Sequence, residues 1–247
     1  EHLAELDAAL EAAEAQTDDV LDVERHHFPL PTLGPELERI KADLVDGLGV
    51  ALLRGLDVAR YGKERASTIY WGIGTHLGSP WPQNAKGHLL GDVTDQGKAY
   101  DDPTSRGNEI GGLPFPFHSD GSDLVGLFCL DPGLRGGESL VANVVSIHNE
   151  MVRSEPDLAA ALYEPLPYDQ RGEHAPGAKG WYLMPAFTRH GDRLFTRYIR
   201  PYIHAAARHA DAPAVSDVAH EAMDLLDSLC ADPDHHVSMQ LEPGDMQ

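Results

Sequence analysis

The stretch "FHSDGSDLVGLFCL" (residues 117–130) places a histidine and an aspartate one residue apart, directly before an apolar run. The run at 124–130 is typical of a buried β-strand. On an extended chain, residues i and i+2 lie on the same face, so the His118 imidazole and the Asp120 carboxylate can converge on one metal ion. The spacing by itself nevertheless favours an ordinary turn capped by Asp120. The rest of the sequence is needed to choose between these two interpretations.

The composition is that of a globular protein with a strongly acidic surface. The 247 residues suit one large domain, and the formal net charge is −21, from 40 acidic and 19 basic residues. This charge argues against nucleic acid as a partner, because phosphates require a basic face. No apolar run approaches the length of about 20 residues that a membrane helix needs. The start of the chain lacks a signal-peptide pattern and the two cysteines are widely spaced, so we expect a cytoplasmic protein with free thiols.

Hydrophobic periodicity predicts an α+β fold with a mainly β core in a single domain over residues 1–247. Helices are expected at 1–20, 35–47, 64–78, 154–164 (with Ser154 as N-cap) and 216–230. Strands are expected at 50–55, 124–130, 139–145, 182–199 (a hairpin around "HGD") and 235–241. The pattern Gly72-x-Gly74 lies inside a helix and does not indicate a nucleotide-binding turn. A jelly-roll barrel with flanking helices is one solution for such a set of elements.

The surroundings of His118 favour the metal site over the turn. Residues 92–114 form a long polar stretch, which in a compact domain is usually a lid or binding loop. After the apolar run, "GGES" (136–139) supplies two glycines that allow close backbone approach and Ser139, whose hydroxyl could reach a carboxylate ligand. A neutral nitrogen with an anionic oxygen suits Fe(II) in a two-histidine, one-carboxylate site. The common zinc, phosphate-loop and nucleophile-elbow motifs are absent from the sequence.

The stretches "LPFPFHSDGSDLVGLFCL" and "GGESLVANVVSIHNEM" together resemble the TauD/TfdA-like branch of the Fe(II)/2-oxoglutarate dioxygenases, within the clavaminate-synthase-like superfamily. The resemblance extends upstream to "LVDGLGVALLRGL" and "YWGIGTHLGSPWPQNAKGHLLGDV", and downstream to "YIRPYI" and "EPGDMQ". It covers roughly residues 35–247. This combination is far more specific than the His-x-Asp pair alone.

The resemblance implies a double-stranded β-helix (jelly-roll) core and the cofactors Fe(II), 2-oxoglutarate and O2. It implies that His118 and Asp120 are two of the three iron ligands, and that Ser139 hydrogen-bonds 2-oxoglutarate. The family's third ligand, a histidine, and the arginine that pairs with the cosubstrate follow the "PGD" turn, so both are expected beyond Gln247. The carboxylate at Asp120 favours oxidation without halide. The implied reaction is oxidation, foremost hydroxylation, of an unactivated C–H bond of a small molecule, with release of succinate and CO2.

Substrate contacts can be named only as candidates. Asn84 and Lys86 precede the lid in a family-like context, and the remaining candidates are aromatic, thioether or basic side chains of the second half: Trp181, Tyr182, Met184, Arg197 and Arg200. The substrate would be an amino acid or a natural-product intermediate. Two other functions remain open at this point, a non-catalytic jelly-roll binding module and a cupin-type enzyme with another metal. No membrane partner is expected, and a homo-oligomer is compatible with the sequence.

Overall fold

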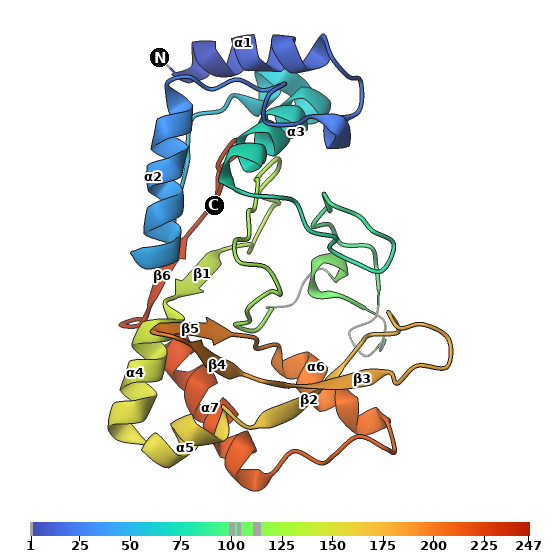
Figure 1. The fold of residues 1–247 in the computed structure, drawn as a ribbon, viewed down its shortest axis with the longest axis vertical. Helices are drawn as coiled ribbons and strands as arrows, with labels where there is room; N and C mark the ends of the chain where they lie inside the picture. The colour runs from blue at the N-terminus through green and yellow to red at the C-terminus, as the bar shows by residue number, and fades with distance from the viewer. Residues whose placement is uncertain (1, 99–101, 103–104, 111–114) are drawn as a thin grey trace.

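The computed structural model describes residues 2–98, 102, 105–110 and 115–247. Three helices gather in the upper half of Figure 1: α1 (His2–Glu14), α2 (Leu33–Asp46) and α3 (Val58–Leu77), with the short 3-10 helix η1 (Val20–Asp22) between the first two. All three α-helices were predicted from periodicity and are confirmed. Their apolar faces form one hydrophobic core with Phe28 and Leu30, and Met246 from the end of the chain joins it.

The helices of this upper core are fixed to one another by polar contacts at their ends. The Glu5 carboxylate of α1 accepts hydrogen bonds from the amides of Thr32 (2.6 Å) and Leu33 (2.9 Å), so it satisfies free donors at the start of α2. Within α3, Gly72 lies directly against the buried ring of Phe28. The pair Gly72-x-Gly74 is therefore part of a packed helix, as predicted.

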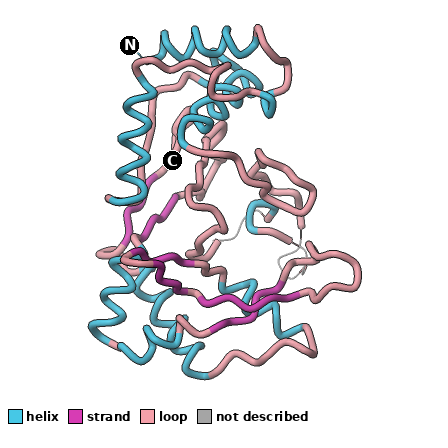
Figure 2. Tube along the Cα trace, in the orientation of Figure 1, coloured by secondary structure: helices cyan, strands magenta, loops and turns pink. Residues whose placement is uncertain are grey.

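The lower half combines short antiparallel strands with helices. Strand β2 (Pro165–Asp169) pairs with β3 (Trp181–Pro185), and β4 (Phe187–His190) pairs with β5 (Arg193–Thr196) around the predicted "HGD" turn. Figure 2 shows these strands running across the molecule as one bent ribbon. The remaining elements of this half are helical: α4 (Val144–Ser154), α5 (Pro156–Ala161), α6 (Arg200–Ala205), η3 (Ala206–Arg208) and α7 (Asp217–Ala231). A second hydrophobic core lies between them.

Two local expectations were wrong in this half. The strand expected at 139–145 ends early, because the Asn143 side chain accepts hydrogen bonds from Val145 and Ser146 amides and so starts α4. Ser154 is the last residue of α4 and does not cap the next helix, which follows Glu155.

The two halves are joined by paired segments that are distant in sequence. Strand β1 (Ser139–Ala142) pairs antiparallel with β6 (His236–Met239) in the middle of Figure 1. The end of the chain runs between two further segments, since Met246 bridges both Leu53 and Phe128. The strands expected at 50–55 and 124–130 therefore exist only as single bridges.

The sheets are small and open. Among the described residues the strands form three two-stranded antiparallel ladders, β1–β6, β2–β3 and β4–β5. This confirms a mixed fold with antiparallel pairing, while the closed jelly roll stays a prediction. No described helix has the length and apolar character needed to cross a bilayer. Of the predicted lid at 92–114, residues 99–101, 103–104 and 111–114 lie outside the described residues; the rest includes the 3-10 helix η2 (Gly107–Glu109).

Candidate metal centre

The Ser119 side chain fixes the orientation of the His-x-Asp turn. Its hydroxyl accepts a hydrogen bond from the Tyr198 amide (2.8 Å) and donates one to the Thr196 carbonyl (3.0 Å), and its own amide donates to the Tyr198 carbonyl (2.8 Å). Ser119 is thus pinned to the chain that leaves β5. Neighbouring residues on an extended chain face opposite sides, so a chain extended here would place His118 and Asp120 opposite the Ser119 hydroxyl.

The tautomer of His118 is defined by one hydrogen bond. Its Nδ1 lies 2.9 Å from the carbonyl oxygen of Pro116. A carbonyl can only accept, so Nδ1 carries the proton and the lone pair of Nε2 is free to bind a metal ion. The ring is exposed, and the edge of Phe115 lies against it at a centroid distance of 4.3 Å. These features fit an imidazole ligand.

Asp120 complements this histidine. Its side chain is exposed, and it has no hydrogen-bond or ion-pair partner among the residues that the structure describes. A carboxylate and a neutral imidazole nitrogen are donors that suit Fe(II). No cluster of three or more His, Cys, Asp or Glu side chains suited to a metal ion occurs within the described residues. The assignment of His118 and Asp120 as iron ligands therefore stays a prediction.

Ser139 lies at the first position of β1, opposite Met239 of β6. Two nearby glycines, Gly136 and Gly137, have φ angles of 74° and 79°, a backbone conformation that residues with a side chain rarely adopt. The segment His118–Asp120, called the ligand turn from here on, lies close to the β1–β6 ladder, because the ring centroid of the preceding Phe117 is 5.8 Å from that of His236 in β6. The assignment of Ser139 to 2-oxoglutarate stays a prediction.

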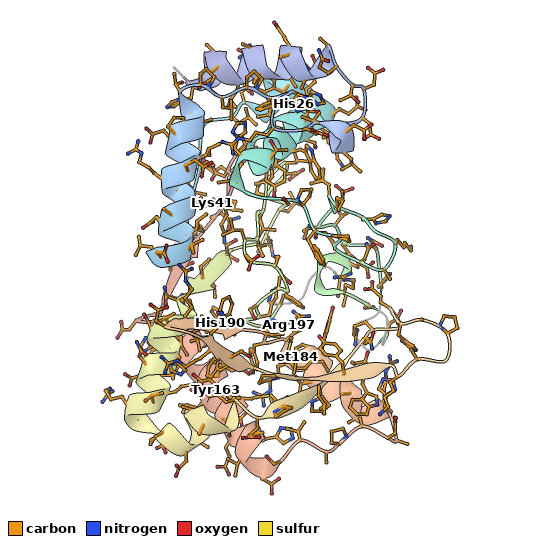
Figure 3. The ribbon with its side chains drawn as sticks, viewed as in Figure 1. His26, Lys41, Tyr163, Met184, His190 and Arg197 are labelled. Carbon is orange, nitrogen blue, oxygen red and sulfur yellow. The ribbon has the colours of Figure 1, made fainter. Side chains whose placement is uncertain are left out.

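Two of the predicted substrate residues lie beside the ligand turn. The Arg197 guanidinium donates from Nη1 to the Ser119 carbonyl (3.0 Å), and its Nη2 lies 3.5 Å from the Tyr182 hydroxyl. Tyr182 in turn stacks on the buried ring of Tyr168. Figure 3 shows Arg197 on the side of the ribbon that faces the middle of the molecule, with Met184 just below it. Tyr182 and Arg197 are thus brought to the candidate site.

Two further candidates, Trp181 and Arg200, have partners elsewhere. Trp181 is buried and donates to Asp211 (2.9 Å). Arg200 forms ion pairs with Asp224 and Asp227 of α7. Burial lowers the pKa of Arg200, but the hydrogen bonds to these two carboxylates outweigh that effect and raise it.

The loop that contains the candidates Asn84 and Lys86 is held by hydrogen bonds between residues close in sequence. The Asn84 side chain accepts hydrogen bonds from the amides of Lys86 and His88, and Lys86 itself is exposed. These contacts shape a turn before the lid region. The proposed roles of Asn84 and Lys86 toward a substrate stay predictions.

Sequence reasoning missed Ser119 and Phe115, which orient the ligand turn. Ser119 stands between two conspicuous residues and has no pattern of its own. Its role depends on Tyr198, 79 positions away in the chain. No sequence signal could have found that contact, because long-range backbone pairing has no local signature.

Known proteins of similar sequence agree on the kind of protein. The family model described as "Taurine catabolism dioxygenase TauD, TfdA family" matches residues 12–247. FR-33289 synthase from Streptomyces rubellomurinus is 32% identical over 245 residues, which are 96% of this chain and 71% of that protein. The taurine hydroxylase-like protein SAT17 from Stachybotrys chartarum is 27% identical over 185 residues, which are 71% of this chain and 46% of that protein.

The fold is also similar to that of a solved structure, an asparagine oxygenase in complex with Fe(II), 2S,3S-3-hydroxyasparagine and succinate. The TM-score is 0.70 at 19% sequence identity, over 98% of this chain and 81% of the other. The family match over residues 12–247 defines the class of protein as a non-haem iron oxygenase. The chain belongs to the TauD, TfdA family, and it is a 2-oxoglutarate-dependent dioxygenase whose cofactors are Fe(II), 2-oxoglutarate and O2.

Proposed function

We propose that this enzyme hydroxylates an unactivated C–H bond of a small molecule, with release of succinate and CO2, and that His118 and Asp120 hold the iron. The observation that carries the proposal is the pair of donors on either side of Ser119: the hydrogen bond of His118 is at Nδ1, and the exposed Asp120 has no partner among the described residues. The free Nε2 of His118 and the unengaged Asp120 carboxylate supply a neutral and an anionic donor. When bound there, Fe(II) with 2-oxoglutarate supplies the activation of O2.

The chain's own residues then bind and orient the substrate. Tyr182 offers a hydroxyl and Arg197 a cation beside the ligand turn, so we propose that they contact a polar or anionic group of the substrate. One protein of similar sequence is named as taurine hydroxylase-like, and the solved structure of similar fold is an asparagine oxygenase. An amino acid or a natural-product intermediate with an acidic group is therefore the substrate class we propose. Ser139, in turn, is proposed to contact 2-oxoglutarate.

The third ligand is proposed to be a histidine that follows Gln247 in the chain. Leu127 and Gln247 exchange two backbone hydrogen bonds (2.8 and 2.9 Å) in an antiparallel pair. A continuation in the same register would run beside residues 126–118 and so toward the ligand turn. Such a strand would also extend the ladders toward the double-stranded β-helix, which we propose as the complete core.

The test is an anaerobic titration of the protein with Fe(II) and 2-oxoglutarate. A weak visible charge-transfer band is expected for the wild type. His118→Ala and Asp120→Ala should lose the band, because each removes a ligand. His190→Ala and Asp123→Asn are matched controls, since both residues are exposed and lie outside the proposed donor set; they should keep the band.

The outcomes separate the candidate functions. Absence of a band in the wild-type protein would contradict the iron assignment and leave a non-catalytic binding module. A band that survives His118→Ala would show that other residues hold the metal, as in a cupin-type enzyme.

A further inference from the structure

Arg171, in the loop between β2 and β3, has an unusual backbone conformation that is stabilised by the buried Asp169 carboxylate. Its φ angle is 54°, the only positive value for a non-glycine residue in the described part of the chain. Such a conformation persists only where the surroundings impose it. Here the Asp169 carboxylate accepts a hydrogen bond from the Arg171 amide (2.6 Å). Asp169 is fully buried and is itself fixed by Arg208 (2.5 Å) and His209 (2.8 Å).

The Arg171 side chain reaches from this base to the polar loop that precedes the ligand turn. Its guanidinium donates to the Ser105 carbonyl from Nε (3.1 Å) and Nη2 (2.5 Å), and to the Asp102 carbonyl from Nη2 (3.0 Å). The ring of Tyr202 lies against the guanidinium, 5.3 Å away. These contacts hold the described part of the loop against the lower half of the molecule.

Two residues after Ser105, at Gly107, the same polar loop contacts the candidate metal centre. Gly107 begins η2, and a Cβ at this position would lie 2.3 Å from the Phe115 ring. The backbone therefore packs directly on that ring, which glycine alone permits. The Phe115 ring in turn lies edge-on to the His118 imidazole. An unbroken series of contacts thus leads from the buried Asp169 to the proposed iron ligand.

We infer that Arg171, Gly107 and Phe115 are positioning residues for the iron centre. Arg171 docks the loop, Gly107 brings its backbone onto Phe115, and Phe115 restricts the rotation of the exposed His118 ring, which has a hydrogen bond at only one nitrogen. Groups that orient a ligand in this way change metal affinity about 10- to 100-fold when they are altered. The inference rests on the proposed function in one respect, namely that His118 is a ligand.

Docking is tested without metal, by hydrogen exchange in the full-length protein. Arg171→Gln should speed exchange of the Glu109 amide, which donates to the Arg106 carbonyl at 3.0 Å, by about tenfold or more. Arg189→Gln, an exposed arginine on β4, is the matched control and should leave this exchange unchanged. Urea midpoints of both variants check that the whole protein remains folded. Unchanged exchange in Arg171→Gln would overturn the docking step.

Positioning is tested by Fe(II) titration in the presence of 2-oxoglutarate, read by the charge-transfer band. Arg171→Gln and Gly107→Ala should weaken Fe(II) binding about tenfold or more and shift the band. The double variant Gly107→Ala, Phe115→Ala removes the clash between the new methyl group and the Phe115 ring. Protection of the loop amides from hydrogen exchange should therefore return, while the affinity for Fe(II) stays low. Wild-type affinity in variants with an undocked loop would overturn the inference. Loss of the band in His118→Ala would still support the proposed function, so the two failures are distinguishable.

Discussion

At the scale of single residues, the ligand turn depends on a serine that is not itself a ligand. Ser119, between His118 and Asp120, forms two side-chain hydrogen bonds to the backbone of Thr196, at the end of β5, and Tyr198. The i, i+2 spacing of His118 and Asp120 is local and can be read from the sequence, while their role as iron ligands stays a proposal. The sequence also offered Arg197 and Arg200 as equal candidates. Only the structure distinguishes the two arginines. Arg200 forms ion pairs with carboxylates of α7, whereas Arg197 donates a hydrogen bond to the ligand turn.

Ser119→Ala is expected to destabilise the protein by about 1–3 kcal/mol, because it leaves the buried Tyr198 amide without its side-chain partner. The turn would also lose its orientation, so Fe(II) binding should weaken in the same variant. Urea unfolding and Fe(II) titration measure the two effects. Ser122→Ala, at an exposed position of the same turn, is the control. Equal behaviour of the two variants would contradict the role given to Ser119.

At the scale of elements, close packing overrides helix propensity in α3. Periodicity predicted this helix, and it is present. What the sequence could not indicate is why Gly72 occurs in its interior, where glycine is unfavourable by about 1 kcal/mol. The reason is tertiary: a Cβ here would lie 2.4 Å from the fully buried ring of Phe28. The strands were harder to predict, because their lengths depend on partners far away in the chain.

Gly72→Ala is expected to destabilise the protein by about 1–3 kcal/mol, since the added methyl group forces the Phe28 ring to move in a full core. Gly74→Ala in the same helix meets no atom within 4 Å and should be neutral or stabilising by up to about 1 kcal/mol. Thermal and urea unfolding of both variants check the contrast. Stabilisation by Gly72→Ala would mean that propensity outweighs packing.

At the scale of the whole molecule, the stability of the fold includes a buried charge cluster in the lower half. Burial raises the pKa of the Asp169 carboxyl, but hydrogen bonds from Arg208 and the Arg171 amide outweigh this effect, so the pKa lies below its ordinary value of 3.8. Because folding lowers this pKa, the carboxylate stabilises the protein above pH 3.8. That contribution is lost as the pH falls below 3.8 through the folded-state pKa.

Asp169→Asn should therefore lower the free energy of unfolding by about 3 kcal/mol at pH 7, since it breaks a buried ion pair. The difference from wild type should shrink as the pH falls below about 4. Urea unfolding at pH 7, 5, 4 and 3 measures it. Asp192→Asn, in the exposed turn between β4 and β5, is the control and should follow the wild type at every pH. A difference that is constant with pH would contradict the assignment.

The sequence by itself determined the features that depend on neighbours along the chain. These are the helices α1, α2, α3 and α7 and the β4–β5 hairpin, because periodicity and turn chemistry act over a few residues. Only the tertiary structure decided what fixes Ser119 in the turn, which arginine lies beside it, and what holds the preceding loop. Those features rest on contacts such as Ser119 with Tyr198 and Arg171 with Ser105, which join residues 79 and 66 positions apart. Such pairs meet only when the whole chain has folded, so no local pattern can encode them.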